Sequence, residues 1–179
     1  MRNVMKTATL ESKFPLLSVE HGCIVSKDAD ITVAYKVELP ELFTLTKAEY
    51  EAVHSTWAKA VKVLPNYSIV HKQDFFIEES YRPDICKDDL KHTRYLFLTK
   101  TTKERNRTTS SFNALTRNFI IPKEMTDRET ITRFMESCEQ FERIVNDSGL
   151  LRMTRLTDEE ITGTDTSAGI IEKYFSLSQ

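Results

Sequence analysis

The clearest pattern along the chain is a two-residue alternation between residues 31 and 39. One set of alternate positions is apolar (Ile31, Val33, Tyr35, Val37 and Leu39), and the other includes Thr32, Lys36 and Glu38. This period predicts a strand with one buried face. Short apolar pieces flank Gly22, and residues 26–30 have the composition of a turn. Strands near 16–26 and 30–39 are therefore expected to form an antiparallel hairpin.

A well-delimited helix is predicted directly after this hairpin. Pro40 closes the second strand, and Thr46 and Glu49 have the spacing of a capping box, in which each side chain bonds the other residue's backbone N–H. Pro65 ends the helix. Its apolar positions recur at helical spacing and comprise Tyr50, Val53, Trp57, Ala60, Val61 and Leu64.

The middle of the chain contains two more strand patterns and a polar connection. Residues 67–79 alternate but carry apolar side chains on both faces, which predicts an interior strand, and residues 95–98 (YLFL) are expected to form a central strand. Residues 82–93 are polar and predict no clear element. Residues 100–118 are rich in Thr, Ser, Asn and Arg and indicate a loop, before residues 119–122 return to the core. A short helix within or beside that loop is suggested by Phe112, Leu115 and Phe119.

The last third of the chain contains two further capping boxes. Thr126 and Glu129 open a helix that ends at Gly149 and whose apolar positions are Ile131, Phe134, Cys138, Phe141 and Val145. Residues 150–156 alternate as a strand. Residues 157–160 (TDEE) begin a short helical turn that Gly163 ends, and a last helix is expected near residues 167–176.

The expected order of elements is β-β-α-β-loop-β-loop-α-β-α. An N-terminal hairpin followed by a helix, with antiparallel patterns elsewhere, predicts an α+β fold. We expect a two-layer sandwich in which helices pack on a mostly antiparallel sheet. A length of 179 residues suits one domain, expected over residues 14–179 after a flexible N-terminus at residues 1–13.

The composition is that of an ordinary folded domain. Hydrophobic residues make up 40% and charged residues 29%, and a net charge of −2 creates no overall field that attracts nucleic acid or anionic lipid. No apolar run approaches the roughly 20 residues needed to cross a bilayer. The chain has three cysteines, and no two of them have the spacing of a CxxC motif (Cys23, Cys86 and Cys138). This argues against a disulfide framework or a zinc finger and favours reduced thiols in the cytoplasm.

The sequence contains no recognisable catalytic motif. A P-loop requires GxxxxGK[ST], but the four glycines are isolated, and two isoleucines follow Gly169 where Lys and Ser or Thr would be needed. His21 and Cys23 could share one strand face as part of a metal site or as a thiolate beside a base. No third ligand or orienting carboxylate lies near them in sequence, so a turn between strand ends is favoured. Adjacent carboxylates such as Glu159 and Glu160 are explained by capping and by the helix dipole.

The strongest local charge lies at residues 100–107 (KTTKERNR). Its cations could contact phosphates or anionic headgroups and comprise Lys100, Lys103, Arg105 and Arg107. A solvated loop is the simpler interpretation and is favoured. Because no aromatic residues are interleaved for base stacking, sequence-specific recognition of nucleic acid is not expected. These four residues are therefore candidates for an anion or partner contact only.

Several segments taken together carry a likeness to a known family. They are KFPLLSVE with GCIVSKDADITVAYKVELPELFTL, then YSIVHKQDFFIEESYRPD, YLFLTKTTKER and IIPKEMTDRETITRFMESCEQFERIVNDSGL. They resemble the N-terminal domain of TraG, the conjugation ATPase of conjugative transposons, which is akin to the hexameric ATPases of type IV secretion. The likeness covers essentially the whole chain, and the ending IIEKYFSLSQ is then expected to be a domain boundary. The connection from Cys86 to Arg94 is shorter than the family's pattern.

The resemblance implies a non-catalytic docking and oligomerisation domain of a conjugative-transfer ATPase that powers DNA transfer between bacteria. Such a domain would lie in the cytoplasm at the inner-membrane face. ATP and Mg²⁺ would bind only in a C-terminal motor domain, so no catalytic, cofactor-binding or metal-binding residue is expected in this chain. The implied partners are inner-membrane channel proteins, the chain's own motor domain and further copies of the chain; direct DNA binding stays open. The alternatives are a module that binds nucleic acid or anionic lipid through residues 100–107, and a stand-alone enzyme whose site no motif reveals.

Overall fold

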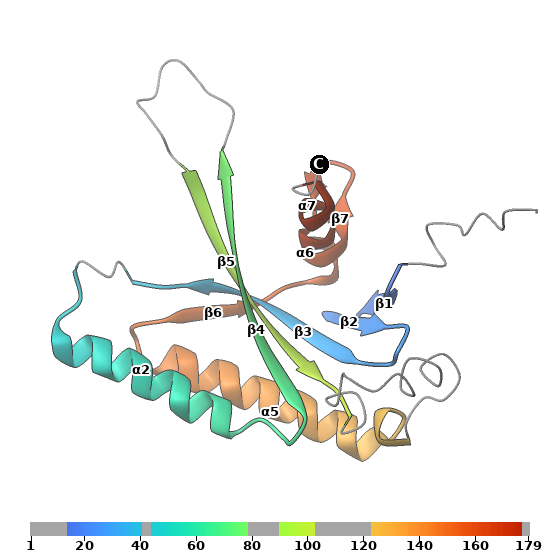
Figure 1. Ribbon diagram of the computed structural model, residues 1–179, viewed down its shortest axis with the longest axis horizontal. Coiled ribbons are helices and arrows are strands. Elements are labelled where there is room, and N and C mark those ends of the chain that lie inside the picture. Colours follow the sequence, from blue (N-terminus) through green and yellow to red (C-terminus); the bar gives the residue numbers. More distant parts are fainter. Residues whose placement is uncertain (1–13, 41–43, 79–89, 103–122, 177–179) are drawn as a thin grey trace, which may run out of the picture.

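The α+β architecture predicted from the sequence is confirmed by a computed structural model, which describes residues 14–40, 44–78, 90–102 and 123–176 (Figure 1). A mostly antiparallel sheet is packed by helices, and an N-terminal hairpin precedes the first long helix. Some predictions of local structure concern segments outside the described residues. They are the flexible N-terminus at 1–13, the short helix around Phe112 to Phe119, and the return to the core at 119–122.

The sheet is organised around its third strand. In chain order its strands are β1 (Leu16–Glu20), β2 (Cys23–Ser26), β3 (Ile31–Glu38), β4 (Ser68–Glu78), β5 (Leu90–Lys100) and β6 (Arg152–Arg155). Their order in space is β1-β2-β3-β5-β4. One edge of β3 pairs with β5, from Val37 opposite Arg94 to Ile31 opposite Lys100. The other edge is shared, because β2 pairs with its first half and β6 with its second half.

Two long helices cover one face of this sheet. They are α2 (Lys47–Lys62) and α5 (Arg128–Asp147), which lie side by side in Figure 1, and the 3-10 turn η2 (Lys123–Met125) leads into α5. The apolar face of β3 packs on them, and the Trp57 and Phe141 rings of the two helices lie 6.2 Å apart. The buried Tyr35 hydroxyl donates a hydrogen bond to the Cys138 carbonyl at 3.4 Å. Among the described residues, no helix is both long enough and apolar enough to cross a bilayer.

The opposite face of the sheet carries a second, smaller core. The C-terminal elements α6 (Asp158–Thr162), β7 (Gly163–Thr164), β8 (Ser167–Ala168) and α7 (Ile170–Ser176) lie on this side (Figure 1). Ile161 and Ile170 pack here with Ala34 of β3. The short β7–β8 ladder occupies residues that the sequence pattern assigned to the start of the last helix, so α7 begins at Ile170.

The predicted capping boxes at the starts of α2 and α6 are confirmed. The Thr46 N–H donates to Glu49 Oε2 at 2.8 Å, and the Glu49 N–H donates to Thr46 Oγ1 at 3.3 Å. Thr157 and Glu160 repeat this pattern. The prediction for α5 was wrong by one residue. Its N-cap is Asp127, which accepts the Thr130 N–H at 2.9 Å, because the preceding 3-10 turn engages the Thr126 hydroxyl through the Lys123 carbonyl.

Three other details of the sequence prediction were wrong. Residues 16–26 form two strands rather than one, because His21 and Gly22 both have positive φ (56° and 68°) and make a tight turn. Residues 67–79 were predicted as an interior strand, but β4 is at the edge of the sheet. Its apolar side chains on both faces are therefore in part exposed. Tyr50 and Val61, assigned to the buried stripe of α2, are 58% and 47% exposed, because the core contacts run through Val53, Trp57, Ala60 and Leu64.

The β1–β2 turn is held in place by two side chains from the C-terminal part of the chain. The Asp158 carboxylate accepts the His21 N–H at 3.1 Å and the Gly22 N–H at 2.5 Å. Arg155 Nη2 donates to the His21 carbonyl at 2.8 Å. A Cβ at Gly22 would lie 3.1 Å from the Leu156 carbonyl oxygen, so this close approach also favours glycine. The N-terminal hairpin is therefore joined to the junction of β6 and α6.

Replacing Asp158 with alanine is expected to lower the free energy of unfolding by about 1–3 kcal/mol, because two turn amides lose a charged acceptor. Urea unfolding followed by circular dichroism measures this change. Glu159→Ala is the matched control in the same first turn of α6, where an exposed substitution should change stability by no more than about 0.5 kcal/mol. Equal effects of the two substitutions would show that helix charge, rather than the turn contact, is responsible.

Candidate functional site

The β4–β5 hairpin extends beyond the rest of the sheet. β4 and β5 pair continuously from Ser68 opposite Lys100 to Glu78 opposite Leu90, whereas the pairing of β5 with β3 stops at Arg94. Residues 75–78 and 90–93 therefore project past β3, and we call this part the arm (Figure 1). A two-stranded ribbon is marginal by itself, so the arm needs side-chain contacts at its base.

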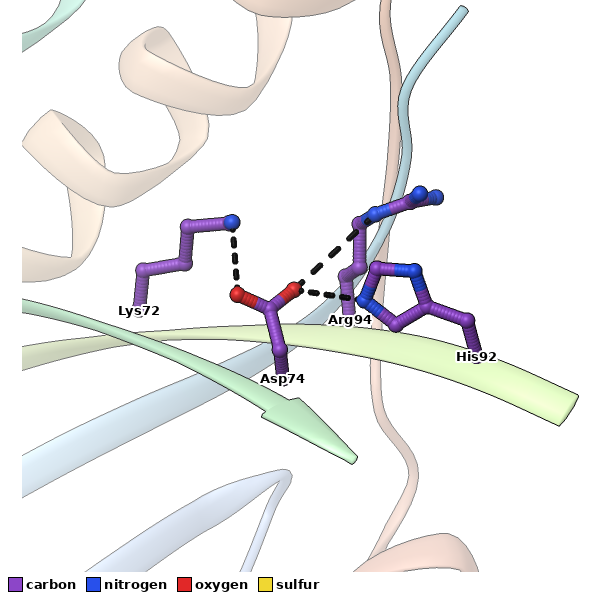
Figure 2. Close-up of polar contacts among 4 residues, drawn as sticks. All are labelled: Lys72, Asp74, His92 and Arg94. Atoms are coloured by element: carbon purple, nitrogen blue, oxygen red, sulfur yellow. Dashed lines mark hydrogen bonds and ion pairs between the residues drawn. The ribbon is translucent and has the colours of Figure 1, made fainter. Parts of the chain in front are cut away.

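A cluster of charged side chains occupies the base of the arm (Figure 2). The Asp74 carboxylate lies at its centre. Lys72 Nζ approaches Asp74 Oδ2 at 2.7 Å, and His92 Nε2 lies 3.0 Å from Asp74 Oδ1. Arg94 Nε lies 3.9 Å from the same oxygen. Two neighbouring strands thus place three basic side chains around one carboxylate.

The cluster lies on the same face of the sheet as the main core. In the pairing of β4 with β5, Asp74 is opposite Arg94 and Lys72 is opposite Leu96. Side chains alternate between faces along a strand, so these residues share a face with Leu96 and Leu98. Leu96 and Leu98 are buried in the main core, whereas the side chains of the cluster are between 27% and 47% exposed. The charged cluster is therefore the partly exposed continuation of the main-core face.

The environment of Asp74 favours its ionised form. Partial burial raises the pKa of this carboxyl, but hydrogen bonds from Lys72 and His92, together with their charges, outweigh that effect and hold the pKa below its ordinary value. The groups are partly exposed, so such a network stabilises the hairpin only modestly. The four side chains together make a polar surface of mixed charge.

An exposed aromatic side chain lies next to the charges. The Phe76 ring stacks on His92 with ring centroids 4.1 Å apart and remains 60% exposed. On the other face, Phe75 is buried against Tyr95, with ring centroids 5.5 Å apart. Phe75 therefore anchors the arm to the second core, while Phe76 is presented to solvent. Exposed aromatics beside Arg are typical of protein–protein contact sites.

Lys100, the first of the predicted anion-contact residues, has a structural role. It is the last residue of β5 and is only 5% exposed. Its Nζ donates to the Asn66 carbonyl at 2.9 Å and the Thr101 carbonyl at 3.1 Å. The same Nζ lies 5.7 Å from the centroid of the Tyr67 ring. Lys103, Arg105 and Arg107 lie outside the described residues, so the anion contact stays a prediction for those three.

His21 and Cys23 are not arranged as a nucleophile and its base. His21 contributes its backbone to the turn, and the near neighbour of the Cys23 sulfur is Arg155 Nη2 at 3.3 Å. Burial raises the pKa of Cys23, and the Arg155 charge offsets this only in part. Burial raises the pKa of Cys138 to about 12. Both thiols are therefore protonated at neutral pH, and Cys86 lies outside the described residues. Within the described ranges, no group of three or more His, Cys, Asp or Glu side chains could hold a metal ion.

The Asp74 cluster could not be recognised from the sequence alone. Lys72 and Asp74 lie two apart on a strand, as do His92 and Arg94, and each pair taken alone resembles ordinary surface polarity. Residues 90–93 were included in a polar stretch with no assigned element, but they belong to β5. Had the hairpin register been known, alternate positions on its two strands would have revealed the cluster.

A titration tests the cluster directly. Replacing Lys72 with methionine should raise the pKa of Asp74 toward its ordinary value, because the strongest charged donor is lost. NMR observation of the side-chain carboxyl carbons measures this pKa. Asp127, whose pKa is lowered by hydrogen bonds from Thr130, is an internal control that should not change. Since the Asp74 pKa is lowered by folding, its stabilising effect should be present at neutral pH and disappear as the pH falls through that pKa.

Comparison with known proteins gives one partial match. A family described as "Domain of unknown function, B. Theta Gene description (DUF3875)" matches residues 3–55, which extend from before β1 into α2. This match covers less than half of the 179 residues. No curated protein and no solved structure matches the chain.

Proposed function

We propose that this chain is a non-catalytic docking and oligomerisation domain of a conjugative-transfer ATPase of the type IV secretion class. In this proposal it lies at the cytoplasmic face of the inner membrane and contacts channel proteins there. The observation that carries the proposal is the arm, which presents the exposed Phe76 beside a cluster of charges. The resemblance of the chain to the N-terminal domain of TraG supplies the biological setting.

The chemistry of the arm suits a protein partner better than a polyanion. A surface that binds nucleic acid or anionic lipid gathers cations that neutralise phosphates. Here the basic side chains of Lys72, His92 and Arg94 already surround the carboxylate of Asp74, which would repel a phosphate. A mixed-charge surface with an adjacent aromatic ring instead suits a protein surface that has its own apolar and polar groups.

The construction of the arm also suits docking. Phe75 and Tyr95 hold its base in the second core, so Phe76 is presented from a supported strand rather than from a loose loop. A supported contact loses less conformational entropy on binding. ATP hydrolysis, in this proposal, takes place in a motor domain that follows this one, and the reading frame of the full-length protein should continue into a GxxxxGK[ST] segment.

Binding to the channel proteins of its own transfer system tests the proposal. The purified chain should bind one of the purified inner-membrane channel proteins in detergent and should not hydrolyse ATP. Phe76→Asp should weaken this binding roughly tenfold or more, as expected when an aromatic contact at the centre of an interface is lost. Calorimetry or surface plasmon resonance with the purified channel protein measures the dissociation constant.

Tyr50→Asp provides the matched control. Tyr50 is an aromatic residue of similar exposure, 58%, but it lies on α2. Its substitution should leave channel binding unchanged. The proposal fails if none of the channel proteins binds the chain, or if the two substitutions weaken binding equally.

A further inference from the structure

We propose that the open edge of β4 pairs with β4 of a second copy of the chain. The two strands run antiparallel, and Gln73 of each copy lies at the two-fold axis. This inference rests on the oligomerisation part of the proposed function and names its interface.

The two ends of the sheet differ in how well they could accept another strand. β1, at one end, has five residues, and its pairing with β2 shifts register between Leu16 and Ser18. Short and irregular edge strands are poor templates for further pairing. β4, at the other end, has eleven residues that pair with β5 in one unbroken register. In the part of the chain that the structure describes, no strand covers its outer edge.

The backbone of β4 determines which residues can pair across this edge. The Thr101 N–H donates to the Tyr67 carbonyl at 3.0 Å, so the carbonyl of Tyr67, the residue before β4, points toward β5. These directions alternate along an antiparallel strand. The N–H and C=O groups of residues 70, 72, 74 and 76 therefore point toward the open edge. A two-fold axis at residue 73 places 72 opposite 74 and 70 opposite 76, and all of these can form hydrogen-bonded pairs.

The side chains of β4 are complementary to themselves in this register. Lys72 of one copy faces Asp74 of the other, and the reverse pair repeats the contact across the axis. Val70, which is 38% exposed, faces Phe76, which is 60% exposed. All of these side chains lie on the same face of the sheet, so opposite charges and apolar groups meet in cross-strand pairs.

Neighbouring registers lack this match. A two-fold axis at residue 72 would place Lys72 opposite its own copy, and an axis at residue 74 would do the same for Asp74. Like charges directly opposite each other are destabilising. An axis at residue 71 would place Lys72 opposite Val70 and Asp74 opposite Ser68, so neither charge would meet an opposite charge. An axis at residue 75 would place Lys72 opposite Glu78 but Asp74 opposite Phe76, and Val70 would lose its aromatic partner. The register centred on Gln73 is therefore favoured, because it alone pairs Lys72 with Asp74 and Val70 with Phe76.

Charged residues on an edge strand can also serve to prevent pairing. The two roles predict different results when a charge is reversed. A charge that prevents pairing does so whatever its sign, whereas the proposed contact requires opposite charges on the two chains.

Sedimentation equilibrium of the full chain should show a monomer–dimer equilibrium. Lys72→Asp should weaken dimerisation roughly tenfold or more, because two cross-strand ion pairs become like-charge pairs. Asp74→Lys should do the same.

Combining Lys72→Asp with Asp74→Lys should restore dimerisation to within a few-fold of the original chain. Arg133→Glu on α5 is the matched control, since it reverses an exposed charge that also has an ion-pair partner, at 2.8 Å, and it should leave the equilibrium unchanged. A chain that is monomeric at every accessible concentration would overturn the proposal. So would single reversals that leave the dimer intact, or a double variant that stays as weak as the single ones although NMR shows its β4–β5 hairpin to be folded.

A cross-link at the axis tests the register. Residue 73 would form a non-hydrogen-bonded pair with its copy, with Cα atoms about 4.5 Å apart, which is within the range for a disulfide. With Cys86 replaced by serine, Gln73→Cys should give a disulfide-linked dimer under diamide. His71→Cys is the control on the same face of the sheet. In this register residue 71 of one chain lies four positions along the strand, about 13 Å, from residue 71 of the other chain, so these two cysteines should not cross-link. Equal cross-linking of both variants would contradict this register.

These measurements separate the inference from the proposed function. A monomeric chain that still binds a channel protein would remove the β4 pairing and leave the docking role intact. A chain that dimerises through Gln73 but binds no channel protein would support the pairing and remove the docking role.

Discussion

The fold depends on the position of β3 at the centre of the sheet. One edge of β3 is hydrogen-bonded to β5, and the other edge is divided between β2 and β6. Its two faces serve different cores, because Val33 and Tyr35 pack toward the long helices, whereas Ala34 packs toward α6 and α7. A single eight-residue strand therefore connects the N-terminal hairpin, the long hairpin and both helical layers. A strand with both edges and both faces occupied leaves no surface of its own for another partner.

The candidate functional surface exists because β4 and β5 are longer than β3. Each has eleven residues, and the residues beyond the end of β3 have no β3 backbone to pair with. They are stabilised by the Phe75–Tyr95 contact on one face and by the charges around Asp74 on the other. The side chains that folding does not bury there, chiefly Phe76, are the ones available for contact. The same excess length leaves the outer edge of β4 regular and open.

Two carboxylates illustrate how surroundings decide the role of a residue type. Asp158 accepts two backbone amides and thereby joins the β1–β2 turn to the C-terminal part of the chain. Asp74 is paired with side chains instead, on an exposed ribbon, and its contacts shape a surface more than they hold the fold together. Lys100 was expected in an exposed basic loop, but its side chain is buried and donates hydrogen bonds to backbone carbonyl oxygens. Sequence proximity to Lys103 and Arg105 gave no indication of that burial.

Features that depend on only a few neighbouring residues could be predicted from the sequence. The alternation in β3, the capping boxes of α2 and α6, and the buried positions of α5 were all readable, because they depend on backbone period and on contacts within one helical turn. Three features required the folded chain: β4 is an edge strand, β1 and β2 are separate strands, and Asp74 contacts His92. Each of these depends on which distant segments pair, and the sheet register that sets such pairs is not encoded in any local pattern.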